Sequence, residues 1–183
     1  MSGDNIQIAI RVRPFNQREE GENCIIDMKQ LKNYGTVFIT DPEDSETKEF
    51  KYNHTFWSHD DKNGKSIFTN SELHSKIGIE LLENAYQGFN STVFAYGQTG
   101  SGKSYSIEGI PSDEGLLQRV CESLFKKKDE LKAQDDKNDI VVNVSYLEIY
   151  NENLRDLLDS SDKNLKIYSV RNSIIVKNLS KVP

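Results

Sequence analysis

Eight consecutive residues combine glycines, a lysine and a serine at a spacing that suits the binding of phosphate. The run is Gly97-Gln98-Thr99-Gly100-Ser101-Gly102-Lys103-Ser104, a full match to G-x-x-x-x-G-K-[ST]. Its glycines allow the backbone to wrap closely enough for N–H groups to face phosphate oxygens. Lys103 adds a full positive charge for the β- and γ-phosphates, and Ser104 adds a hydroxyl for Mg²⁺. The spacing therefore predicts a nucleoside triphosphate site.

The sequence on both sides of this loop has the form that phosphate binding requires. The β-branched and aromatic run Thr92–Tyr96 lies between Asn90 and Gly97 and predicts a buried strand. A helix is expected to follow the loop, and its N-terminus would add partial positive charge. A flexible glycine and serine turn that happens to contain a lysine is the alternative, and the flanking elements argue against it.

A pair of arginines lies on a predicted strand near the N-terminus. Apolar and polar residues alternate from Ile6 to Arg13, which predicts a half-buried strand that Pro14 ends. The alternation places Arg11 and Arg13 on one face, opposite the isoleucines. Taken alone, R-x-R-P is typical of a solvated strand end and indicates no ligand.

Most of the remaining chain predicts scaffold. A small hairpin around an acidic turn is expected from Thr36–Thr40 and Glu49–Tyr52. A capping box at residues 69–72 opens an amphipathic helix that ends near residue 88, and a second helix carries an apolar stripe over residues 116–125.

The C-terminal part predicts a further set of short elements. Ile140–Tyr150 is β-rich, Asn153–Leu158 has the pattern of a one-turn helix, and Leu165–Tyr168 with Ser173–Val176 predicts a two-stranded arm. Five cations decorate this arm without an acidic residue after Asp162: Lys163, Lys166, Arg171, Lys177 and Lys181.

Composition limits the classes of protein to which the chain can belong. Its 183 residues suggest one domain. A net charge of −6 argues against general binding of nucleic acid. The absence of a long apolar run or an apolar leader leads us to expect a cytosolic protein with no direct membrane contact. Two isolated cysteines fit a reducing compartment.

The longest motif resembles the nucleotide-binding loop of kinesins. FAYGQTGSGKSYSIEG is similar to the usual kinesin form FAYGQTG-[SA]-GK-[ST]-YTMxG, with departures at Ser106 and Ile107. Other kinesin-like pieces follow the same order along the chain: IAIRVRPFN at Ile8–Asn16, FWSH at Phe56–His59, SYLEIYNENLRDLL at Ser145–Leu158 and VKNLSKVP at Val176–Pro183. The resemblance covers essentially the whole chain, and FWSH with GKSY leans toward the branch that carries vesicles along axons.

The resemblance implies an α/β P-loop NTPase fold, with a central, mostly parallel sheet flanked by helices. It implies ATP and Mg²⁺ as ligands, with Arg11, Arg13 and Pro14 bordering the adenine and Tyr105 as the ring on its other side. In kinesins the lobe that corresponds to the cationic arm touches tubulin, so the arm is a candidate microtubule contact. Edge-strand lysines that block aggregation are an equally weighted alternative. The cytoplasm and its microtubule cytoskeleton are the location implied.

Two further kinesin loops, N-x-x-S-S-R-S-H and D-L-A-G-S-E, do not occur in the sequence. In kinesins they sense the γ-phosphate and organise Mg²⁺ and water. Residues 1–183 are therefore expected to form the nucleotide-binding half of a motor domain, incomplete in its fold and not competent for hydrolysis alone. The alternatives are a non-motor product that binds nucleotide or tubulin and, with 96 residues before the loop, a less fitting small P-loop kinase. Cargo would be set by other parts.

Overall fold

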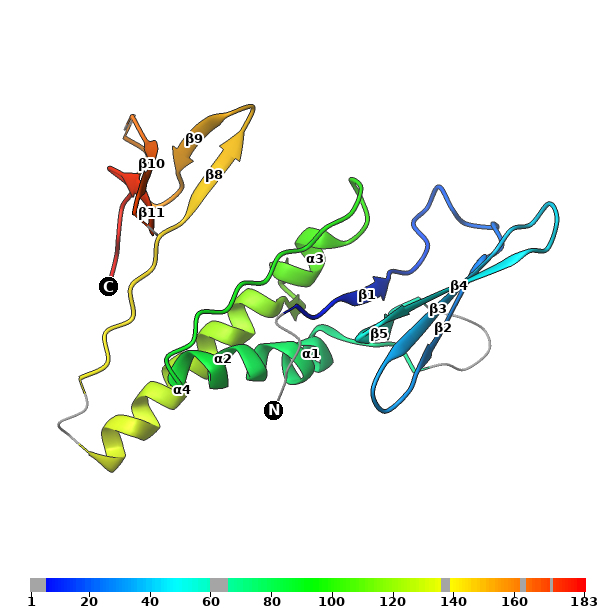
Figure 1. Cartoon of the computed structure of the whole chain (residues 1–183), viewed down its shortest axis with the longest axis horizontal. Coiled ribbons are helices and arrows are strands. Elements are labelled where there is room, and N and C mark those ends of the chain that lie inside the picture. Colours follow the sequence, from blue (N-terminus) through cyan, green and yellow to red (C-terminus); the bar gives the residue numbers. More distant parts are fainter. Residues whose placement is uncertain (1–5, 60–65, 136–138, 162–163, 172) are drawn as a thin grey trace. The chain divides into compact units, whose positions relative to one another are not determined.

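The computed structural model describes residues 6–59, 66–135, 139–161, 164–171 and 173–183. It comprises two units, Met1–Lys126 and Lys127–Pro183, with the boundary inside the helix α4 (Leu116–Gln134). Figure 1 traces both units, and each is described by itself. That residues 1–183 form a single partial domain stays a prediction.

The N-terminal strand of the first unit carries the arginine pair. β1 (Ala9–Val12) pairs in parallel with β5 (His54–Trp57), so that Arg11 lies opposite Phe56. This is the one parallel pairing within the described residues. The register leaves Arg13 and Pro14 just beyond the carboxyl end of the strand, which is where ligands bind in open α/β sheets.

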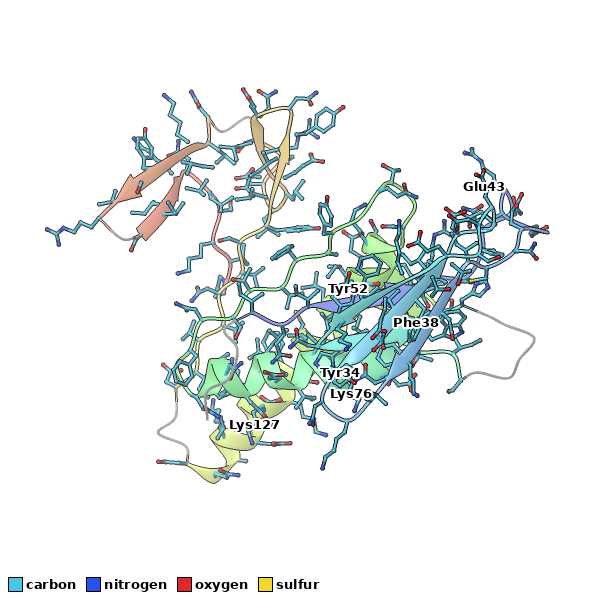
Figure 2. All side chains as sticks on the ribbon, turned by 45° about the vertical axis from the view of Figure 1, so that its right-hand side comes forward. Tyr34, Phe38, Glu43, Tyr52, Lys76 and Lys127 are labelled. Atoms are coloured by element: carbon cyan, nitrogen blue, oxygen red, sulfur yellow. The ribbon has the colours of Figure 1, made fainter. Side chains whose placement is uncertain are left out.

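An antiparallel sheet lies beside this pair. β3 (Gly35–Thr40) and β4 (Thr47–Tyr52) form the predicted hairpin, and β2 (Ile26–Gln30) adds a third strand that the sequence did not indicate. The acidic turn is closed by its own carboxylates, since Asp41 accepts from the Glu43 N–H and Asp44 accepts from the Glu46 N–H. Figure 2 shows Glu43 at this end of the hairpin, with Tyr34 at the opposite end.

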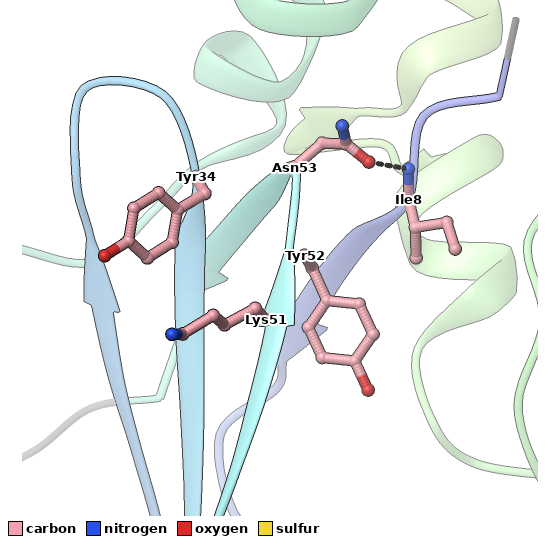
Figure 3. A pocket seen from close by; sticks show the side chains of 5 residues that line it. All are labelled: Ile8, Tyr34, Lys51, Tyr52 and Asn53. Atoms are coloured by element: carbon pink, nitrogen blue, oxygen red, sulfur yellow. Dashed lines mark hydrogen bonds between the residues drawn. The ribbon is translucent and has the colours of Figure 1, made fainter. Parts of the chain in front are cut away.

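A shallow hollow of about 270 Å³ lies between β1 and β4 (Figure 3). Its lining consists of Ile8, Tyr34, Lys51, Tyr52 and Asn53. The Asn53 side chain accepts a hydrogen bond from the Ile8 N–H at 2.8 Å, which closes one wall. The single charge in the lining, Lys51, lies over the Tyr34 ring and 3.5 Å from Glu49, so the hollow offers no uncompensated group for a ligand.

The predicted helix after Thr69 is confirmed, with an irregularity. It consists of α1 (Asn70–Leu73), a π-turn η1 (His74–Gly78) and α2 (Ile79–Tyr86). The capping box is complete: the Glu72 N–H donates to Thr69 Oγ1 and the Thr69 N–H donates to the Glu72 carboxylate.

A small apolar core joins these helices to the phosphate-loop region. After α3 (Lys103–Ile107), two short strands, β6 (Gly109–Ile110) and β7 (Asp113–Glu114), lead into α4. The buried residues of the core are Phe56, Leu73 and Leu116, and Phe68, Ile77, Ile107 and Val120 pack around them. The helix that leaves the loop is thus anchored on its apolar side by Ile107.

The prediction of a buried strand at Thr92–Tyr96 is wrong for this chain. These residues are extended but pair with no strand among the described residues, and the Phe94 and Tyr96 side chains are 83% and 95% exposed. A strand needs hydrogen-bonding neighbours, and none of the described strands lies along this segment. Its β-rich composition therefore leaves an exposed apolar stretch.

The second unit is built from two antiparallel hairpins. β8 (Leu147–Tyr150) pairs with β9 (Asn153–Asp156), and β10 (Lys166–Val170) pairs with β11 (Ser173–Lys177), which confirms the two-stranded arm. The expected helix at Asn153–Leu158 is wrong. Positive φ angles at Asn151 and Glu152 make a tight hairpin turn, which sends the chain back as a strand.

The β-rich run Ile140–Tyr150 is regular only at its end. Before β8 it contributes a single bridge, between Val144 and Val182. Buried Asp156, the last residue of β9, accepts the N–H groups of Leu158 and Ser180 and so links β9 to the segment after β11. Within the described residues, no helix is long and apolar enough to cross a membrane.

Candidate nucleotide-binding site

The glycines of the predicted phosphate loop have backbone angles that other residues rarely adopt. The φ angles are +154° at Gly97, +80° at Gly100 and +95° at Gly102. Gly102 is the N-cap of α3 in the left-handed region, where a side chain would strain the backbone. This reversal turns the chain directly into α3, whose first-turn N–H groups have no partner within the helix. The loop thus has the backbone of a phosphate cradle.

The Lys103 ammonium lies against the loop itself. Its Nζ donates to the carbonyls of Gly97 and Gln98, each at 2.8 Å. Because these carbonyls begin the loop and Lys103 ends it, the side chain bridges the mouth of the cradle. An anion held by the loop would therefore lie within reach of a full positive charge.

Ser104 has the chemistry for a metal bound together with phosphate. It is exposed in the first turn of α3, and its hydroxyl has no hydrogen-bond partner among the described residues. Nowhere in the described residues do three or more His, Cys, Asp or Glu side chains form a group that could bind a metal ion. A Mg²⁺ ion held by Ser104 would take further ligands from phosphate oxygens and water, since this ion usually keeps several waters.

Arg13 contacts the middle of the loop. Its Nε donates to the Gly100 carbonyl at 2.7 Å, and its Nη1 donates to the Pro14 carbonyl at 2.7 Å. The two terminal nitrogens also form a bidentate pair with the Glu19 carboxylate, at 2.6 and 2.7 Å. All three nitrogens are therefore engaged with protein oxygens.

Arg11 lies within β1, two residues before Arg13. Its Nη1 donates to Ser106 Oγ at 2.9 Å and to Asn70 Oδ1 at 2.7 Å, and its Nε donates to Ser58 Oγ at 2.9 Å. Asn70 is fully buried and donates to the Tyr105 carbonyl at 3.2 Å. Burial lowers the pKa of Arg11, which nonetheless remains charged. The two arginines of R-x-R-P thus hold the loop and the helix that follows it.

The Tyr105 ring is fixed from two directions. The Arg11 guanidinium lies over the ring, 5.2 Å from its centroid. The Tyr105 hydroxyl donates a hydrogen bond to the Asp113 carboxylate. This hydrogen bond raises the pKa of Tyr105. Asp113 is in turn paired with Arg119 at 3.3 Å. Arg11 and Asp113 therefore hold the Tyr105 side chain in place at the start of α3.

The sequence missed four residues of this arrangement: Glu19, Asn70, Asp113 and Arg119. Only Asn70 had a local signal, because it follows the Thr69 cap. Glu19 lies in a polar stretch without periodicity, and nothing in its type or spacing indicates its pairing with Arg13.

The Glu19–Arg13 pair predicts a component of acid sensitivity. Hydrogen bonds from Arg13 and from the Asn16 N–H lower the pKa of Glu19 from 4.5 to about 2. Its contribution to stability is therefore present above pH 4.5 and is lost as the pH falls toward 2. In a folded polypeptide that carries this sequence, Glu19→Gln should make the free energy of unfolding less dependent on pH between about 5 and 2. Denaturant titrations across that range test this, with Glu43→Gln as the control. An unchanged slope for Glu19→Gln would contradict it.

The described cations of the arm lie on its two strands, at its turn and just after β11. Lys166 and Lys177 are direct cross-strand partners, Arg171 lies at the hairpin turn and Lys181 follows β11. All four side chains are exposed. Lys163 lies outside the described residues. The ladder thus places two ammonium groups side by side on one face.

A family model of the kinesin motor domain matches residues 11–183. The chain belongs to the kinesin motor domain family. This motor-domain chain is 42% identical over 174 residues to mouse Kinesin-like protein KIF28, across 85% of the chain and 16% of that protein. It is 36% identical over 180 residues to Kinesin-related protein 1 of Dictyostelium discoideum, across 92% of the chain and 8% of that protein. It thus spans less than a fifth of these curated relatives.

Solved kinesin structures have the same fold. A KIF14 dimer, in its two-heads-bound state with AMP-PNP and a microtubule, aligns with a TM-score of 0.79 at 30% identity, over 97% of this chain and 50% of that one. The predicted α/β, P-loop NTPase class is confirmed, and the chain corresponds to about half of that solved chain. The lean toward the axonal branch stays a prediction.

Proposed function

We propose that this chain carries the ATP-binding part of a microtubule motor ATPase. The observation that carries the proposal is the phosphate loop, whose three positive-φ glycines curve around the Lys103 ammonium. The KIF14 structure that resembles the chain holds AMP-PNP and a microtubule, which supports both ligand classes.

In this proposal the loop amides and the first turn of α3 bind the β- and γ-phosphates, and Lys103 exchanges its loop carbonyls for phosphate oxygens. The adenine lies beside Pro14 and against the Tyr105 ring. Arg11 and Arg13 border this site mainly by positioning, since their nitrogens already donate to protein oxygens.

Ser104 would hold Mg²⁺ together with the phosphates, and the bound ion would neutralise charge between the β- and γ-oxygens. The loop residues bind and orient the nucleotide. The sequence lacks the two loops that organise the attacking water in kinesins, so we assign no hydrolytic step to its residues.

The microtubule contact is proposed for the cationic arm, which would place the protein at the cytoplasmic microtubule cytoskeleton. The acidic net charge of −6 requires that any attraction to an acidic surface be local. The cross-strand pair Lys166 and Lys177, at the open end of the β10–β11 hairpin, provides such a local concentration of charge.

Co-sedimentation with microtubules tests this contact. In a folded polypeptide carrying this sequence, Lys166→Glu/Lys177→Glu should weaken binding, and the loss should shrink as salt rises because exposed charges are screened beyond about 10 Å at 0.1 M salt. Lys32→Glu/Lys48→Glu is the matched control, since it changes net charge equally on the antiparallel sheet. Equal losses in both variants would mean that only net charge matters and would contradict a contact by the arm.

A further inference from the structure

The peptide group between Gly100 and Ser101 is held at both ends. Its carbonyl accepts from Arg13 Nε at 2.7 Å, and its N–H donates to the Gln98 carbonyl at 3.1 Å. Because the peptide is planar and trans, these two bonds fix the orientation of the whole group. This peptide lies in the middle of the phosphate loop, so its orientation constrains the amides on either side.

Arg13 is well placed to fix this orientation. Beyond its bond to Gly100, its Cβ would lie 3.8 Å from a Cβ built on Gly102, so the side chain passes next to a second loop glycine. A guanidinium is a rigid planar fork, and a bidentate carboxylate fixes its plane. Once that plane is fixed, the direction of the Nε–H is fixed as well.

Glu19 supplies the bidentate carboxylate, and Glu19 is itself held. Its carboxylate accepts from the Asn16 N–H at 3.0 Å, and its own N–H donates to the Asn16 carbonyl at 2.9 Å. The tight turn thus presents the carboxylate in one place. The carboxylate also neutralises Arg13, which leaves the arginine to act through geometry rather than through net charge.

We propose that Glu19 is a positioning residue for phosphate binding, which acts through Arg13 to hold the Gly100–Ser101 peptide in the orientation that the nucleotide requires. This inference rests on the proposed function, because it concerns the same loop. It adds a residue that lies outside the loop and the R-x-R-P motif.

A double-mutant cycle tests whether Glu19 acts through Arg13. The measurement is the dissociation constant of Mg·ATP by equilibrium titration, in a folded polypeptide that carries this sequence. Glu19→Ala should weaken binding about three- to tenfold, the scale of one hydrogen bond. Arg13→Lys should produce a similar loss, since a single ammonium cannot hold Glu19 and the Gly100 carbonyl in one plane. In the Arg13→Lys background, Glu19→Ala should add no further loss, because both changes break one unit.

The controls separate this inference from the proposed function. Glu43→Ala removes an equal charge at the β3–β4 turn, outside the link from Glu19 through Arg13 to Gly100, and should leave affinity unchanged (Figure 2). If Glu19→Ala does not fold, Glu19→Gln keeps the side-chain volume and should show a smaller loss of the same kind. Additive losses in the cycle, or affinity within about twofold of the unsubstituted protein for Glu19→Ala, would overturn the inference while ATP binding stands. Failure of the unsubstituted protein to bind ATP would overturn the proposed function and the inference together.

Discussion

Lys103→Ala is expected to lower the affinity for ATP at least about tenfold in any folded polypeptide that carries this sequence. The substitution removes the only full positive charge within the loop, whose Nζ lies at the mouth of the cradle. Hydrogen bonds to charged groups are worth about 1.5–3 kcal/mol, and about 1.4 kcal/mol corresponds to tenfold in affinity. Equilibrium titration with ATP measures the effect directly.

Lys76→Ala is the matched control for this substitution. Lys76 is an exposed lysine on η1, away from the loop, so its removal changes net charge equally without touching the cradle (Figure 2). Its dissociation constant should equal that of the unsubstituted protein. A Lys103→Ala protein that binds ATP as tightly as this control would contradict the assignment of the loop.

Expressed as residues 1–183 alone, the chain is expected to be poorly folded or to self-associate, and to show no microtubule-stimulated ATP turnover. The extended segment Thr92–Tyr96 exposes Phe94 and Tyr96 almost fully and pairs with no described strand. Burying the unpaired backbone N–H and C=O groups of Thr92–Tyr96 would cost about 1–3 kcal/mol for each group. Several such costs would exceed the free energy of unfolding of a typical domain, which is about 5–15 kcal/mol. Left exposed, the uncharged segment can template pairing with other copies.

Amide hydrogen exchange on residues 1–183, combined with a measurement of mass in solution, tests this expectation. Fast exchange across Thr92–Tyr96 in a monomer, or protection only upon association, agrees with it. Strong protection in a monomer would show that the segment has found partners within the chain and would contradict it.

The sequence predicted the parts of the site that are encoded locally. The loop spacing fixes glycines where the backbone needs positive φ and a lysine where the cradle closes, and the structure has these features at Gly97, Gly102 and Lys103. The capping box at Thr69 was likewise readable, because its two hydrogen bonds join residues only three apart. Local chemistry of this kind does not depend on the rest of the fold.

The parts that could not be predicted depend on contacts between distant residues. The Thr92–Tyr96 run has strand composition, yet whether it pairs is decided by neighbours that composition does not describe. Asn153–Leu158 looked helical from its spacing, but the positive φ at Asn151 and Glu152 made Asn153–Asp156 a hairpin strand. The link from Glu19 through Arg13 to Gly100 joins residues 81 positions apart, and no local pattern records it.

Amide hydrogen exchange of the loop, with Mg·ATP compared with adenosine, tests the central claim most directly. If the loop binds phosphate, the amides of Gly100 to Ser104 should be protected by Mg·ATP and unaffected by adenosine, which carries the base without the phosphates. Protection should also be reduced in the Lys103→Ala protein. Mg·ATP that binds without slowing exchange anywhere in this stretch would place the phosphates elsewhere and contradict the account.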